Sequence, residues 1–165
     1  MSPRICTYGL RPAFGYKLEI QILKAPMPLW LNTFMTDEQL LNELREATRG
    51  LTFMSEADYP FEVFDWGAAE PTHEFLRGLT GGGSDVQVET TTPANFFRVA
   101  ASEAEWKNAE QLTVARRFQK LLRLLEQNLT DLRVYRVGAI NIPVYVAGRG
   151  ASGNWLGVST RVVET

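Results

Sequence analysis

LTFMSEADYPFEVFDW, residues 51–66, is the stretch around which the rest of the chain is organised. The sequence before it predicts a helix that ends at Gly50, and residues 61–66 alternate in the manner of a strand. Between them lies an acidic turn that carries Glu56 and Asp58. Because function concentrates on loops that rigid elements hold in place, we expect this turn to present its carboxylates to the active site of another protein.

The composition bounds the class of protein. The chain has 165 residues, of which 45% are hydrophobic and 22% charged, which is typical of one globular domain with its own core. Its single cysteine, Cys6, excludes an intrachain disulfide, and we expect a cytoplasmic location. One histidine, His73, is too few for a structural zinc site, so no metal or cofactor is expected. No apolar run approaches the roughly 20 residues of a membrane span, so we expect no membrane association.

Charge is distributed unevenly along the chain. The net charge is −2, but residues 51–110 contain eleven acidic and three basic residues, whereas residues 111–165 contain three acidic and eight basic ones. The acidic middle argues against nucleic-acid binding there and for a basic protein partner. Acidic loops that are simply solvated would give the same counts, so both interpretations stay open.

The first 34 residues differ from the rest. They contain four prolines and show no sustained hydrophobic period, so we expect residues 1–34 to be a loosely ordered extension or the product of a misplaced start site. Residues 35–165 are expected to form the folded domain. That domain begins with a helix over residues 36–49, because Thr36 and Gln39 have the spacing of a capping box and Leu40 and Leu44 start an apolar stripe.

Helices and strands share the rest of the domain, which predicts an α+β fold. Beyond the strand at 61–66 the patterns predict a short helix with Thr72 or Pro71 at its front and a strand over 85–89. They also predict a helical turn with Thr92 at its N-cap and a long helix over 109–128. The buried stripe predicted for the long helix comprises Leu112, Ala115, Phe118 (or Gln119), Leu122, Leu125 and Leu129. An antiparallel meander is predicted over 132–137, 142–147 and 155–163.

Two further features are candidate interaction sites. Glu105 and Trp106 form a second acidic and aromatic cluster, in which Trp106 is either an exposed interface anchor or a core residue. Thr165 ends the chain directly after the last predicted strand, which should hold its terminal carboxylate in a fixed position.

Catalysis is the main alternative at this stage. Glu56, Asp58 and His73 could act as acid and base groups, but only if the fold brings them together in one cleft. A lone histidine without an identifiable partner is more typical of a surface or packing position. The basic residues of the long helix allow either a phosphate-contact strip or a solvated face, and the helix is amphipathic, which favours the second.

Several long strings resemble the nuclease A inhibitor family, whose members block a sugar-non-specific DNA/RNA endonuclease. The resemblance covers about residues 36–165 and rests on FMSE at 53–56, YPFEVF at 59–64, THE at 72–74, FQKLL at 118–122, VYRVG at 134–138, VYV at 144–146 and GVSTRVVET at 157–165. It implies a three-layer α-β-α sandwich around a mainly antiparallel sheet. It also implies an inhibitor rather than an enzyme, binding one nuclease as a monomer.

The resemblance also implies roles for single residues. Glu56 matches the loop glutamate that reaches the nuclease's catalytic magnesium, and Thr165 matches a C-terminal threonine in the same region. The pair Glu105–Trp106 matches a supporting acidic and aromatic pair, with Glu where the family has Asp. The chemistry is consistent, because a carboxylate is a hard oxygen ligand for magnesium and acids such as Asp58 can pair with a basic cleft. The alternative is an interaction domain with a different client protein.

Overall fold

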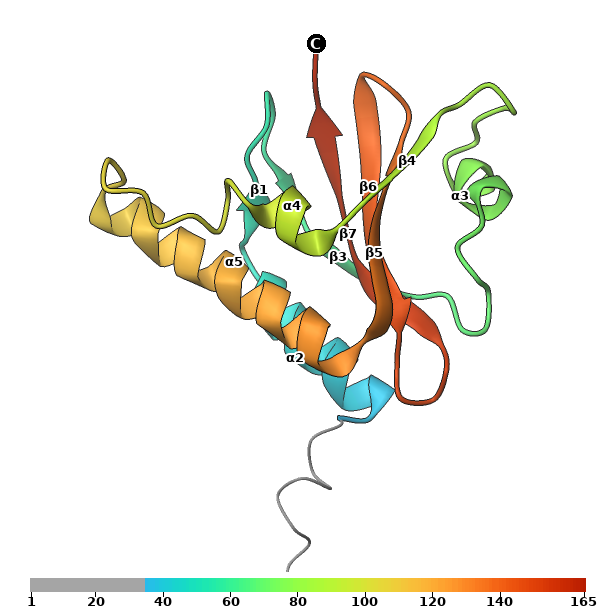
Figure 1. Cartoon of the computed structure of the whole chain (residues 1–165), viewed down its shortest axis with the longest axis horizontal. Helices are drawn as coiled ribbons and strands as arrows, with labels where there is room; N and C mark the ends of the chain where they lie inside the picture. Colours follow the sequence, from blue (N-terminus) through green and yellow to red (C-terminus); the bar gives the residue numbers. More distant parts are fainter. Residues whose placement is uncertain (1–34) are drawn as a thin grey trace, which may run out of the picture. The chain divides into compact units, whose positions relative to one another are not determined.

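The computed structural model describes residues 35–165, and the prediction for residues 1–34 lies outside the described residues. Its centre is a five-stranded antiparallel sheet (Figure 1). The strand order is β3 (Glu62–Asp65), β7 (Trp155–Val163), β6 (Asn141–Arg149), β5 (Thr130–Val137) and β4 (Val88–Thr91). The predicted meander is confirmed as β5, β6 and β7, and β3 and β4 close its two edges.

Helices cover both faces of this sheet. One face packs against α2 (Asp37–Thr48), α4 (Pro93–Phe97) and α5 (Ala109–Asn128), and the other against the short α3 (His73–Leu79) (Figure 1). Successive strand residues point to opposite faces, so Val134 joins the larger core while Tyr135 joins the smaller one beside Leu76. The predicted α+β class is confirmed. Within residues 35–165 no helix is long and apolar enough to cross a bilayer.

The helices begin at the predicted capping residues. Thr36 and Gln39 form the capping box of α2, and Thr72 and Thr92 cap α3 and α4 through their hydroxyls. Helix α5 spans the predicted residues and starts with a second capping box, formed by Asn108 and Gln111.

Two predicted details are wrong. The strand expected at 85–89 begins at Val88, because Val88–Thr91 are the residues that pair with β5. In α5 the fully buried leucine between Phe118 and Leu125 is Leu121, while Leu122 is only partly buried. Leu121 faces the sheet because it lies three residues after Phe118 and four before Leu125, on the same side of the helix.

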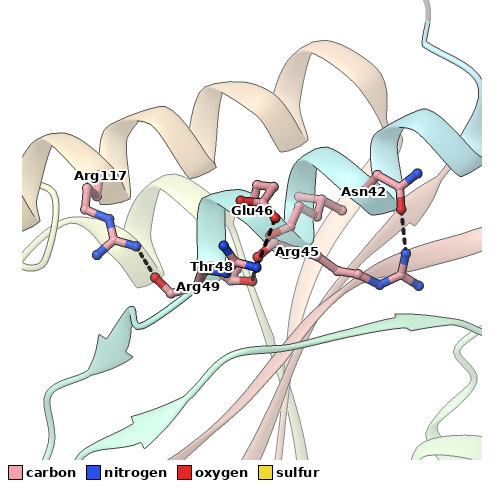
Figure 2. A network of polar contacts seen from close by, with 7 residues as sticks. Asn42, Arg45, Glu46, Thr48, Arg49 and Arg117 are labelled. Atoms are coloured by element: carbon pink, nitrogen blue, oxygen red, sulfur yellow. Dashed lines mark hydrogen bonds and ion pairs between the residues drawn. The ribbon is translucent and has the colours of Figure 1, made fainter.

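The end of α2 is fastened to α5 by a polar network (Figure 2). Arg117 of α5 donates through Nη2 to the carbonyl oxygen of Arg49 at 2.5 Å, and Thr48 donates to the carbonyl of Leu44 at 2.7 Å. Gly50 follows with a φ of 64°, a left-handed conformation that favours glycine. The chain therefore leaves α2 in a fixed direction and enters the acidic loop from an anchored start.

Candidate partner-binding site

The acidic loop of residues 54–58 is the tip of a two-stranded hairpin. Its strands are β1 (Thr52–Phe53) and β2 (Tyr59–Pro60), which pair antiparallel. At its base the Phe53 ring stacks on Phe96 of α4 at 4.6 Å and meets Phe118 of α5 edge-on at 6.2 Å. Aromatic pairs of this geometry stabilise a structure beyond the area that the rings bury, so the base of the loop is well packed.

The loop is also tied to the end of β7. The backbone N–H of Val163 donates to Ser55 Oγ at 3.2 Å, and the Ser55 hydroxyl donates to the Ala57 carbonyl at 2.8 Å. The Thr160 hydroxyl donates to the Pro60 carbonyl at 3.1 Å. These bonds fix the loop relative to the last strand and hence to the chain's end.

Glu56 and Thr165 meet directly. Glu56 Oε1 accepts the Thr165 backbone N–H at 3.2 Å and the Thr165 hydroxyl at 2.5 Å. Both residues are exposed, as is Asp58 two residues further along the loop. We call the Glu56–Thr165 contact the acidic corner.

The residue before Thr165 is held as well. The Glu164 N–H donates to the Ile140 carbonyl at 3.0 Å, and Glu164 Oε1 lies 2.7 Å from Arg136 Nη2. Beside this ion pair lies a groove of about 590 Å³. It is lined by Phe53, Glu89, Thr90, Thr91, Asn95, Phe96, Arg136, Val162 and Glu164.

Sequence reasoning missed Arg136 and Ser55. Arg136 is one of several charged residues in a strand that alternates, and its partner Glu164 lies 28 residues later. Only the register of β5, β6 and β7 brings the two together. Ser55 had a local signal, because serine in a turn often bonds to the backbone two residues on.

Glu105 and Trp106 lie in the loop before α5. Trp106 is 75% exposed, which excludes core packing and leaves the exposed position of the two alternatives. The loop is closed by Lys107, whose Nζ donates to the Ser102 carbonyl at 2.6 Å and lies 5.7 Å from the centroid of Trp106. Among the described residues no hydrogen bond or ion pair joins this loop to the acidic corner, so the two are separate exposed features.

The catalytic alternative requires Glu56, Asp58 and His73 to share one cleft, and the structure does not provide that arrangement. His73 is the first residue of α3, which packs against β4, whereas Glu56 belongs to the hairpin beside β7 (Figure 1). The structure therefore does not bring His73 together with Glu56 and Asp58. Residues 35–165 also contain no group of three His, Cys, Asp or Glu side chains placed to hold a metal ion.

The basic side of α5 has partners within the protein. Arg117 caps the end of α2, and Arg116 lies 3.6 Å from Glu103. These contacts favour the interpretation of a solvated structural face over that of a phosphate-contact strip.

Comparison with known proteins identifies the family of the chain. No curated protein matches the chain significantly. A family model described as nuclease A inhibitor-like protein matches residues 38–165, which includes the hairpin, both acidic features and the C-terminus. The chain therefore belongs to the nuclease A inhibitor-like protein family.

Proposed function

We propose that this protein inhibits a magnesium-dependent, sugar-non-specific endonuclease by placing its acidic corner in the enzyme's active site. Family membership supports an inhibitory role toward a nuclease. The mechanism, the partner residues and the class of target are the proposal. The complex is taken to contain one copy of each protein and to form in the cytoplasm.

The observation that carries the proposal is the contact between Glu56 and Thr165. Both hydrogen bonds from Thr165 go to Oε1 of Glu56, and Oε2 makes none within residues 35–165. One oxygen thus fixes the side chain while the other stays available to a partner. Preorganisation of this kind reduces the entropy that binding would cost, because the rotamer is already selected.

The chemistry of the target explains why a carboxylate would block it. An endonuclease that cuts both DNA and RNA must bind the phosphate backbone, which both polymers share, in a basic cleft. Its magnesium stabilises the charge that develops on the phosphoryl group. A fixed carboxylate oxygen can replace a water on that ion, and unlike a phosphodiester it cannot be cleaved.

Other exposed acids would assist association. Asp58 lies in the same loop and could pair with Arg or Lys of the cleft, which raises the association rate at low salt. The exposed Trp106 with Glu105 would supply an aromatic anchor at a second point of the interface.

The test is inhibition of a purified magnesium-dependent non-specific nuclease, followed with both DNA and RNA substrates. We expect wild-type protein to stop both reactions, and Glu56→Gln to weaken inhibition at least about tenfold, because the charge facing the metal is lost. Glu74→Gln, at an exposed position in the first turn of α3, is the matched control and should inhibit like wild type. Full cleavage by the nuclease of the same organism at excess wild-type protein would refute the proposal.

A different client protein is the second candidate. The exposure of Trp106 suits any protein partner and does not by itself select a nuclease. Affinity capture with wild-type protein and with Trp106→Ala separates the two. A single non-nuclease protein that is lost with Trp106→Ala would favour this candidate.

A further inference from the structure

Arg136 connects the middle of the sheet to the end of the chain. Its Nη2 lies 2.7 Å from Glu164 Oε1, and its side chain is only 24% exposed. The Glu164 N–H is bonded at the same time to the carbonyl of Ile140, in the turn between β5 and β6. Glu164 is therefore held through both backbone and side chain, directly before the residue that meets Glu56.

Packing does little to fix the last two residues. Strand β7 ends at Val163, and Glu164 borders the groove rather than the core. Both Glu164 and Thr165 are exposed. Because packing requires neighbouring atoms on all sides, polar contacts hold this segment: those of Glu164 and the two bonds from Thr165 to Glu56.

Charge at the groove makes Arg136 necessary. Glu89 stands opposite Arg136 in the pairing of β4 with β5 and lines the same groove as Glu164. Glu56 adds one more negative group close by, because it accepts two hydrogen bonds from Thr165. Among the described residues that line the groove, Arg136 is the only cation, so without it mutual repulsion would drive the terminus away from Glu56.

We infer that Arg136 is a positioning residue for the acidic corner, which it assembles by holding Glu164 so that Thr165 meets Glu56. The consequence for binding rests on the proposed function, whereas the positioning itself is a property of the free protein. Arg136 acts through Glu164 and needs no contact with the partner.

The burial of Arg136 separates this role from simple stabilisation. Its Nε is buried and has no hydrogen-bond partner in the part of the chain that the structure describes. An unpaired buried donor opposes folding, so replacing it with an apolar side chain of similar length should not unfold the protein. Arg136→Met should thus displace the terminus while the melting temperature stays within a few degrees of wild type.

The first arm of the test uses the free full-length protein. The Thr165 amide resonance of wild type should differ from its value in a disordered peptide, because Glu56 accepts that N–H. In Arg136→Met it should shift toward its value in a disordered peptide and exchange faster with solvent, while the amide of Val158 in β7 stays unchanged. Arg136→Lys should restore part of the effect, and Arg133→Met, on the other face of β5, should have none.

The second arm measures inhibition. Arg136→Met and Glu164→Gln should each weaken inhibition by about threefold to tenfold. The double variant should inhibit as well as either single variant, because the two residues share one ion pair. An unchanged Thr165 amide in both variants would overturn the inference. A displaced terminus with unchanged inhibition would confirm the positioning role and overturn its consequence for inhibition. A wild-type protein that inhibits no nuclease would refute the proposed function alone, since the first arm would still decide whether Arg136 holds the terminus.

Discussion

The carboxylate of Glu56 and the backbone N–H and hydroxyl of Thr165 form a paired contact between residues 109 positions apart. The contact joins a loop to a chain end, which are the two most mobile kinds of segment in a folded protein. Each restrains the other, and β7 restrains both through Ser55 and Val163. A binding group that is preorganised by such a contact can be rigid although it is exposed.

Coupling between Glu56 and Thr165 is the first prediction. Thr165→Val removes the hydroxyl that donates to Glu56 but keeps the shape of the side chain. In a double-mutant cycle with Glu56→Gln, we expect the losses of affinity for the nuclease to be non-additive by about 1 kcal/mol, because the residues share one contact. Asp58→Asn is the control, because no hydrogen bond joins Asp58 to Thr165 within the described residues and the effect of its loss should add to that of Thr165→Val. Strict additivity for both pairs, measured by inhibition constants, would show that the contact does not matter for binding.

Sequence reasoning predicted the two members of this contact but not the contact. Glu56 and Thr165 were chosen because the chain resembles a family and because a carboxylate suits a metal. Their proximity depends on the register of β3 and β7, in which Glu62 faces Ser159 and Val63 faces Val158. Long-range register is set by the packing of whole faces, so no local pattern in the sequence encodes it.

Trp106 should contribute to binding and not to stability. Its side chain is 75% exposed, so Trp106→Ala removes little buried area and should change the free energy of unfolding by less than about 0.5 kcal/mol. If the indole is an interface anchor, the same change should weaken nuclease binding by about 2 kcal/mol. Binding calorimetry and thermal unfolding measure the two effects on the same sample.

Trp155→Ala is the contrasting variant. Trp155 is 6% exposed at the start of β7, so its truncation should lower the free energy of unfolding by about 3 kcal/mol or more. Equal effects of the two substitutions on stability would contradict the exposure of Trp106.

Gly157 should tolerate no side chain. A Cβ at this position would lie 1.9 Å from the carbonyl oxygen of Val146 on the neighbouring strand, where the obstacle is backbone and cannot rotate away. Gly157→Ala should therefore force β6 and β7 apart and lower the free energy of unfolding by at least about 3 kcal/mol. Gly83→Ala is the control, because a Cβ there meets nothing within 4 Å. Denaturant unfolding of the two variants would contradict the prediction if their midpoints were equal.

The elements with strong local signals were the ones predicted well. Helix α5 repeats apolar residues at helical spacing over its 20 residues. Helices α2, α3 and α4 each begin at a residue whose side chain caps the helix. Strand β4 was misplaced because it has no period of its own and is defined by pairing with β5. The exposure of Trp106 could not be predicted either, since the same residue type serves as a core or an interface residue and only the surrounding packing distinguishes them.

Alkaline pH should unfold the protein partly through Tyr135 and Tyr145. Burial raises the pKa of Tyr135 above 10.0, with Arg133 opposing the shift and Glu70 and Asp131 adding to it. Burial likewise raises the pKa of Tyr145, against the effect of Arg161. The folded state holds these phenolic protons more tightly than the unfolded state does. Their contribution to stability is therefore complete below the unfolded pKa of about 10 and is lost as pH rises through the folded values.

Phenolate absorbance and denaturant unfolding along a pH series test this sign. We expect the two tyrosines to ionise at higher pH than a free phenol does, and Tyr135→Phe to remove one of these high-pH steps in absorbance. The same variant should flatten the fall in unfolding free energy above pH ~10, because its side chain has no proton to lose. Tyr135 lies 6% exposed beside Leu76 and Val137, so phenylalanine fits the same packing. If wild type and Tyr135→Phe lost stability in parallel over that range, burial of this phenol would not be the cause of the alkaline transition.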